Sequence, residues 1–229
     1  MDNFYIYIFG LVCFIVAVSY YNTWYSNNIY KYNEEFVTGE RRFLLMGDSV
    51  LHNNVYVQKG KSVLDLLNDK FKNNPVEKVV SLAKNDATIV SVYNQISAIP
   101  PLFKSGSSSV IFLSIGGNDI LNQLAMKKED VNLDAIFDEY KILVKTIQDM
   151  VPNAQLYIFD LYYPRNDDFE KYYTIIQEWN NKIFNLTMEK NLKLFKISNI
   201  LTQPEDFTDG MEPSAIGGKK LVDEMLKIY

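Results

Sequence analysis

Short apolar runs alternate with amphipathic segments from residue 42 almost to the end of the chain. The runs are brief, mostly uninterrupted by polar residues, and rich in β-branched or aromatic side chains. Such runs are typical of strands that are buried on both faces. The sequence therefore predicts five strands, at 42–46, 78–83, 109–115, 155–160 and 192–197.

The segments between these runs repeat apolar residues at intervals of three and four, which predicts helices at 62–72, 133–150, 168–189 and 214–228. A proline stands at the start of the last one, as is common in first helical turns. Strand–helix alternation predicts right-handed βαβ units. We expect a three-layer α/β/α sandwich with a five-stranded parallel sheet, flavodoxin-like in outline, and a loop at 100–109.

The N-terminal segment is apolar all round, with no charged residue from Phe4 to Tyr21. As a helix these residues would span roughly 27 Å, close to a hydrocarbon core of about 30 Å. Flanking tyrosines and Trp24 fit an interfacial aromatic belt. This predicts a single-pass membrane anchor in residues 1–25, a polar spacer in 26–40 and one catalytic or binding domain in 41–229.

Two alternatives to an anchor are a cleaved signal peptide and a buried core helix. Asp2 stands where a signal peptide would carry Lys or Arg, and no A-x-A-like cleavage site follows. All-round apolarity argues against the core helix. Lys31, Arg41 and Arg42 weakly favour a cytoplasmic domain, but the side of the membrane stays open, and the sequon at Asn185 matters only for a lumenal one.

Composition narrows the function classes. A net charge of −5 and a pI near 5.0 argue against a nucleic-acid partner, which would need a basic face. The single cysteine, Cys13, excludes an intrachain disulfide, a cysteine zinc cluster and a cysteine–histidine catalytic pair. No residue spacing suggests a metal site, and we expect a monomer without a cofactor.

In a parallel sheet, ligands bind at the carboxyl ends of the strands. The first strand is followed by "GDS", which places Ser49 on a tight turn where a nucleophile can sit. A helix N-terminus directly after it would stabilise an oxyanion. The alternative is that Ser49 only caps that helix.

The third strand is followed by "GGND" (116–119), whose Asn118 could aim its side-chain N–H at an oxyanion. The alternative is a glycine turn with a left-handed Asn. Before the last helix, "DGMEPS" places Asp209 and Glu212 three residues apart. Paired carboxylates can raise each other's pKa and make one a usable base, or they can merely cap the helix.

Together these stretches, over residues 42 to 228, resemble the SGNH (GDSL-like) hydrolase superfamily. The resemblance implies a three-layer fold, cofactor-free hydrolysis of esters of lipids, carbohydrates or small acyl groups, and Ser49 as nucleophile. It implies an oxyanion hole from Asn118 and the backbone N–H groups of Ser49 and Asp86, although Asp86 stands where the family has glycine. Asp209 falls on the orienting aspartate of the family's D-x-x-H block.

The main departure is Glu212, which falls on the position of the family's catalytic histidine. With "GDSVL-x-N" and the terminal "EPSA-x-GG", the chain resembles a variant subgroup that has Glu there. A carboxylate ordinarily has a lower pKa than imidazole and lacks its second nitrogen. His52, the only histidine, is an auxiliary candidate because it lies three residues after Ser49, and Asp48 and Gly117 are also auxiliary candidates. The alternative for His52 is a pocket-rim or partly buried residue.

The sequence leaves two main functions open. One is a membrane-anchored serine esterase, lipase or acylhydrolase that works through an acyl-serine intermediate, with Tyr162, Tyr163 and Arg165 lining an acyl or sugar pocket or simply packing. The other is a weak or inactive relative that binds an acyl or carbohydrate ligand or a partner protein. A nucleotide-binding domain is disfavoured because no glycine-rich phosphate loop precedes a helix.

Overall fold

The computed structural model describes residues 42–228, apart from 74–77, 105–108, 127–130 and 191. The predicted anchor and spacer lie outside the described residues, so both stay predictions. Within the part that is described, no helix is long and apolar enough to cross a membrane.

Five parallel strands form a single sheet in the order β2-β1-β3-β4-β5. They are β1 (Arg42–Gly47), β2 (Lys78–Ser81), β3 (Ser109–Ser114), β4 (Gln155–Phe159) and β5 (Lys193–Phe195). This is the flavodoxin-like strand order, and it confirms the predicted sheet. Because the chain runs outward from β1 in both directions, the switch point lies at the carboxyl ends of β1 and β3.

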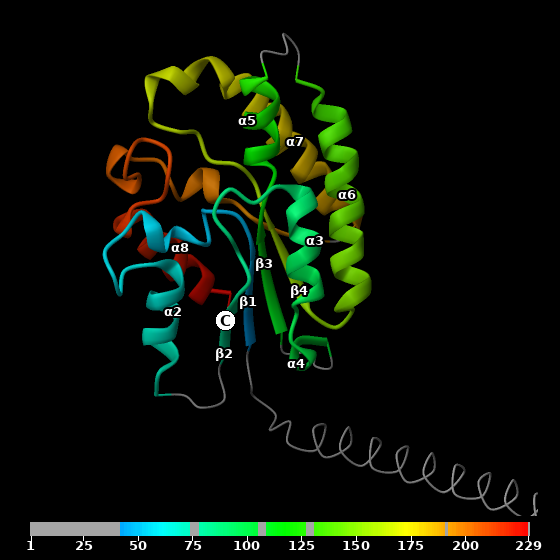
Figure 1. Ribbon diagram of the computed structural model, residues 1–229, viewed down its shortest axis with the longest axis vertical. Helices are drawn as coiled ribbons and strands as arrows, with labels where there is room; N and C mark the ends of the chain where they lie inside the picture. Colours follow the sequence, from blue (N-terminus) through cyan, green and yellow to red (C-terminus); the bar gives the residue numbers. More distant parts are fainter. Residues whose placement is uncertain (1–41, 74–77, 105–108, 127–130, 191, 229) are drawn as a thin grey trace, which may run out of the picture. The chain divides into compact units, whose positions relative to one another are not determined.

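Helices cover both faces of the sheet, which gives the three predicted layers (Figure 1). On one face lie α2 (Val63–Phe71) and α8 (Ala215–Leu226), which contact each other. On the other lie α3 (Ile89–Ser97), α6 (Leu133–Met150) and α7 (Tyr173–Lys190).

Alternate residues of each strand fill two separate cores. Phe43 and Leu45 of β1 pack with α2 and α8, whereas Leu44 and Met46 pack with α3, α6 and α7. All four side chains are buried. The apolar run is continuous because side chains on both faces of a strand must leave water, at about 25 cal/mol per Å² of apolar surface.

The structure also contains short elements that periodicity did not predict. The predicted loop at 100–109 is wrong in part, because α4 (Pro101–Lys104) occupies its start, with a proline as first residue and Phe103 buried. The predicted helix at 168–189 begins as the 3₁₀ helix η2 (Asp167–Tyr172) before α7. The remaining elements are α5 (Gly117–Ala125), η1 (Asn53–Val55), η3 (Ile197–Asn199) and η4 (Pro204–Asp206).

Candidate active site

The turn that carries Ser49 begins at Gly47, where β1 and β3 end side by side. Gly47 has φ +118°, and a Cβ there would lie 1.7 Å from the backbone oxygen of Ser114. Glycine is therefore required for both conformation and space. The side chain of Gln95 on α3 fixes this residue, accepting from its N–H at 2.7 Å and donating to its carbonyl at 2.8 Å.

Ser49 lies on a single turn and not at the start of a helix. The backbone N–H groups of Leu51 and His52 donate to the carbonyl of Asp48, and α2 begins only at Val63. The expected helix N-terminus directly after Ser49 is therefore wrong. Ser49 is also not a cap, because the residue that caps α2 is Ser62.

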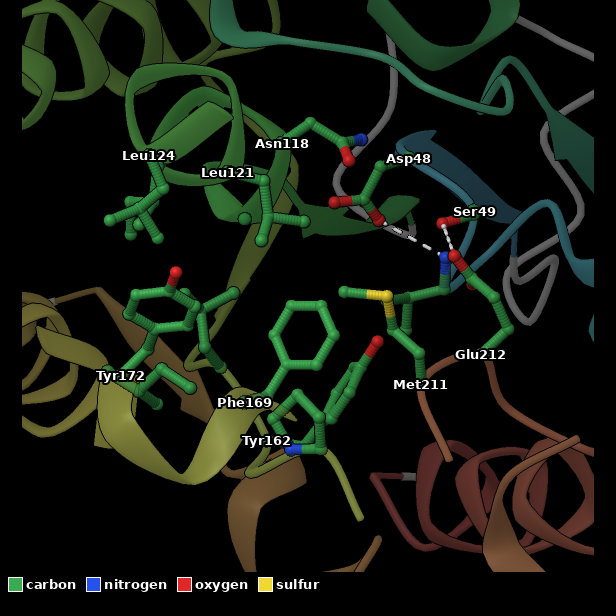
Figure 2. Close-up of a pocket in the computed structure, with 16 residues that line it drawn as sticks. Asp48, Ser49, Asn118, Leu121, Leu124, Tyr162, Phe169, Tyr172, Met211 and Glu212 are labelled. Carbon is green, nitrogen blue, oxygen red and sulfur yellow. Dashed lines mark hydrogen bonds between the residues drawn. The ribbon is translucent and has the colours of Figure 1, made fainter. Parts of the chain in front are cut away.

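The side chain of Ser49 is hydrogen-bonded to Glu212, which comes from the loop before α8. Ser49 Oγ donates to Glu212 Oε1 at 3.1 Å (Figure 2). Ser49 is only 7% exposed, and Glu212 Oε2 is buried with no hydrogen-bond partner among the described residues. Burial raises the pKa of the Glu212 carboxyl; the Ser49 hydrogen bond lowers it, and the charges of Asp209 and Asp86 raise it further. A raised pKa makes a carboxylate a stronger base.

Asp209 acts on the backbone that carries Glu212 and not on its carboxylate. Asp209 Oδ1 accepts from the N–H of Met211 at 3.0 Å and from the N–H of Glu212 at 2.9 Å. It therefore does not hold the base as an aspartate holds a catalytic histidine. Its side chain is exposed, and it influences Glu212 through turn geometry and charge.

The loop that presents Glu212 is anchored by a buried carboxylate. Asp206 is fully buried, accepts from the N–H groups of Thr202 and Gln203 at 2.9 Å, and lies 2.6 Å from the ammonium of Lys220. Its backbone carbonyl accepts from Ser214 N at 2.8 Å. These contacts hold both ends of the loop, and sequence reasoning did not identify them.

The three oxyanion-hole candidates come from three separate strand ends. Neither the Ser49 N–H nor the Asp86 N–H donates to any group in the described chain, so both are free to bind a ligand oxygen. Asp86 has φ +54°, the left-handed region that glycine favours and aspartate tolerates. Asn118, at the start of α5 next to Gly117, donates one side-chain N–H to the carbonyl of Ala87 at 2.9 Å, which leaves the second available.

His52 lies away from this arrangement. It lines a different pocket, beside Leu51, Asn53 and Ser62, and forms no side-chain hydrogen bond with Ser49. The structure thus does not bring together the serine and the histidine of the "GDSVLH" turn. Across the described residues, no three His, Cys, Asp or Glu side chains are grouped so as to hold a metal ion.

A mostly apolar pocket of about 80 Å³ opens beside Ser49, Asn118 and Glu212 (Figure 2). Its volume is several times the roughly 10–15 Å³ that one water needs. Asp48 and Tyr162 contribute polar groups, and burial raises the pKa of the Tyr162 hydroxyl. The apolar walls come from the turn after β1, α5, the segment after β4, η2, α7 and the Glu212 loop: Val50, Ile120, Leu121, Leu124, Leu161, Pro164, Phe169, Tyr172, Ile176 and Met211.

Sequence reasoning missed most of these walls, although the apolar spacing at 120, 121 and 124 is visible in the sequence. Of the three pocket candidates after β4, only Tyr162 lines it. Tyr163 packs edge-on against Tyr173, and Arg165 donates to the carbonyl of Thr202 at 2.5 Å. For Tyr163 and Arg165 the packing alternative is therefore the one the structure shows.

Comparison with known proteins identifies the fold. Three solved structures share it: a lipolytic G-D-S-L family protein from Veillonella parvula (15% identity, TM-score 0.66), the esterase EstA from Pseudoalteromonas sp. inhibited by monoethylphosphonate (17%, 0.59), and the acetyl xylan esterase AlAXEase (16%, 0.63). Each alignment covers 82% of this chain, and 98%, 95% and 98% of theirs respectively. A search of curated protein sequences finds no significant match. The family model for GDSL-like lipase/acylhydrolase matches residues 43–225, and the chain therefore belongs to that family, within the SGNH hydrolase superfamily.

Proposed function

We propose that this protein hydrolyses carboxylic esters through an acyl-serine intermediate, with Ser49 as nucleophile and Glu212 as its base. The observation that carries the proposal is the 3.1 Å hydrogen bond from Ser49 Oγ to Glu212 Oε1. Family membership and the shared fold support an ester hydrolase, since hydrolysis of esters is what the family model describes.

In the first half-reaction Glu212 takes the proton of Ser49 as Oγ attacks the ester carbonyl. The backbone N–H groups of Ser49 and Asp86 and the amide of Asn118 receive the negative oxygen, a contribution of about 3–4 kcal/mol per donor in comparable sites. Glu212 then gives the proton to the departing alcohol. The products of this step are the free alcohol and an ester of Ser49.

In the second half-reaction Glu212 takes a proton from water, whose oxygen attacks the acyl-serine carbonyl. The same donors bind the oxyanion, and Ser49 leaves as its proton returns from Glu212. Asp209 is a positioning residue in this scheme, because its contacts are with the backbone N–H of Glu212 and of Met211.

The pocket favours the acyl part of the ester over a sugar. Its walls are mainly leucine, isoleucine, phenylalanine and proline, and burial of a hydrocarbon chain there gains about 0.8 kcal/mol per CH₂. We therefore propose an aliphatic acyl ester as substrate. Attachment to a membrane through residues 4–21 would suit a lipid-derived ester and remains a prediction.

A weak or inactive binding protein is the second candidate. The observation that favours it is the pair of carboxylates, Asp86 and Asp209, that act electrostatically on Glu212. Their negative charge opposes a developing oxyanion.

Turnover of p-nitrophenyl butyrate separates the two candidates. We expect measurable hydrolysis by the natural chain, loss of it in Ser49→Ala, and full retention in Ser97→Ala, whose hydroxyl lies exposed on α3. No turnover between pH 5 and 9 in a folded protein would contradict the esterase and leave the binding protein.

A further inference from the structure

The two carboxylate oxygens of Asp48 have different surroundings. Oδ1 accepts from Ser114 Oγ at 2.9 Å and from Val50 N at 3.2 Å. Oδ2 has no hydrogen-bond partner in the described chain. The residue is only 4% exposed, yet it lines the pocket beside Ser49. Figure 2 shows the free oxygen on the pocket side, facing Leu121.

An apolar acyl chain would leave this oxygen unsatisfied. Among the described residues no Lys, Arg or His lines the pocket, so none of them places a cation there to compensate the carboxyl. Covering a buried polar group without giving it a hydrogen bond costs about 1–3 kcal/mol. A ligand that supplies a hydrogen bond at this point avoids the cost.

We propose that Asp48 is a specificity-determining residue that selects acyl groups with a hydroxyl close to the ester carbonyl. The inference rests on the proposed function, because it takes Ser49 as the point of attachment. Asp48 directly precedes Ser49, with about 3.8 Å between their Cα atoms, and both residues line the same pocket. An acyl group attached to Ser49 Oγ that also hydrogen-bonds to Asp48 must therefore do so through an atom close to its carbonyl carbon. A hydroxyl on the second or third carbon of the acyl chain meets this requirement.

A hydroxyl suits the site better than an ammonium group. It can donate to an ionised carboxylate or accept from a protonated one, whereas an ammonium can only donate. Both states of Asp48 occur near neutrality, since burial raises its pKa to about 7. An ammonium would also lose its hydration among the apolar walls. The other titratable groups that act on Asp48 are Glu212 and Tyr162, and both are acids.

The test compares the p-nitrophenyl esters of butyrate, 2-hydroxybutyrate and both enantiomers of 3-hydroxybutyrate. Each kcat/KM is divided by the rate of spontaneous hydrolysis of that ester, which removes the intrinsic effect of the hydroxyl. We expect at least one hydroxyacyl ester to exceed butyrate by about tenfold or more. The proposal would be overturned if none of the hydroxyacyl esters exceeded butyrate by about tenfold in this corrected kcat/KM.

The variant Asp48→Asn provides a second readout. It keeps Oδ1 as an acceptor for Ser114 and Val50 and puts a group in the pocket that does not titrate. In the natural chain the preference for the hydroxyacyl ester should rise as the pH passes about 7, because covering an ionised carboxylate with hydrocarbon costs more. The ratio should be flat with pH in Asp48→Asn.

Titration of Glu212 affects all the esters alike and cancels in this ratio. An equal pH dependence in both proteins would overturn the role of Asp48. If no ester is hydrolysed at all, the proposed function itself fails, and that outcome is distinct from hydrolysis without a preference.

Discussion

Ser49 and Glu212 are 163 residues apart in the sequence, yet Ser49 Oγ donates directly to the carboxylate of Glu212. A carboxylate thus stands where a serine hydrolase commonly has imidazole, in contact with the candidate nucleophile. This relationship makes the base the most informative part of the site to test.

Glu212→Gln should lower kcat/KM for a neutral ester by roughly 10²–10⁴, the usual contribution of a general base. The amide keeps the shape of the side chain but does not accept a proton. Steady-state kinetics would measure the loss. Glu224→Gln on α8 is the matched control and should be silent, since the Glu224 carboxylate is partly exposed and pairs with the exposed Lys227. Activity within threefold of the natural chain in Glu212→Gln would show that another group takes the proton.

His52→Ala should change kcat/KM by less than about twofold, and its pH profile should match that of the natural chain. The physical reason is that the ring lines a separate pocket and has no hydrogen bond to Ser49. A drop of tenfold or more with intact folding would restore the histidine as a member of the site.

The pH profile should show a rising limb that belongs to Glu212. The base must be ionised to act, so kcat/KM falls as the pH drops through the Glu212 pKa, which burial holds above 4.5. Asp209→Asn removes a charge that raises this pKa and keeps an oxygen for the two N–H groups. The rising limb of the kcat/KM profile of Asp209→Asn should therefore lie at lower pH than that of the natural chain. A shift to higher pH, or none, would contradict the electrostatic part of the account.

The sheet was predictable because each strand carries its signal locally, as a short apolar run. The nucleophile turn was also visible, since Gly47 and Ser49 directly follow such a run. The apolar walls were not predictable, because they come from six separate segments that only the fold brings together. The spacing of Asp209 and Glu212 correctly predicted that one carboxylate raises the pKa of the other. The orienting role that the resemblance implied for Asp209 is not what the structure shows, because its side chain binds backbone N–H groups and not the base.

Asp48→Asn should stabilise the folded protein at alkaline pH and have little effect at acidic pH. Burial raises the Asp48 pKa from 3.8 to about 7, so the folded state binds the proton more tightly than the unfolded state. Below pH 3.8 Asp48 is protonated in both the folded and the unfolded state, and it does not lower the free energy of unfolding. Between pH 3.8 and about 7 the unfolded state loses the proton first, so the free energy of unfolding declines over this range. The free energy of unfolding of the natural chain is therefore lower by up to about 4 kcal/mol at pH 8 than below pH 3.8, at 1.36 kcal/mol per pKa unit.

Denaturant unfolding at pH 5 and pH 8 measures this effect as the difference between the two proteins. The gain in Asp48→Asn should be larger at pH 8 by on the order of 1 kcal/mol or more. A gain of equal size at both values would mean that Asp48 does not titrate in the folded state in this range.

Gly47→Ala should destabilise the protein by roughly 2–6 kcal/mol, the sum of backbone strain and overpacking. The new Cβ would lie 1.7 Å from the carbonyl oxygen of Ser114. Gly60→Ala is the matched control, because Gly60 also has positive φ but has no atom within 4 Å of its Cβ position. Thermal unfolding of both variants checks the prediction, and an equal loss in both would show that the close contact with Ser114 costs nothing.

Covalent labelling with a fluorophosphonate, followed by peptide mass spectrometry, tests the central claim most directly. The reagent modifies a serine only when a base activates it, so it probes the Ser49–Glu212 contact without knowledge of the substrate. We predict a single adduct on Ser49 at pH 8, at least tenfold slower in Glu212→Gln and absent in Ser49→Ala. No adduct on Ser49 in the folded natural chain, or equal labelling in Glu212→Gln, would contradict the account.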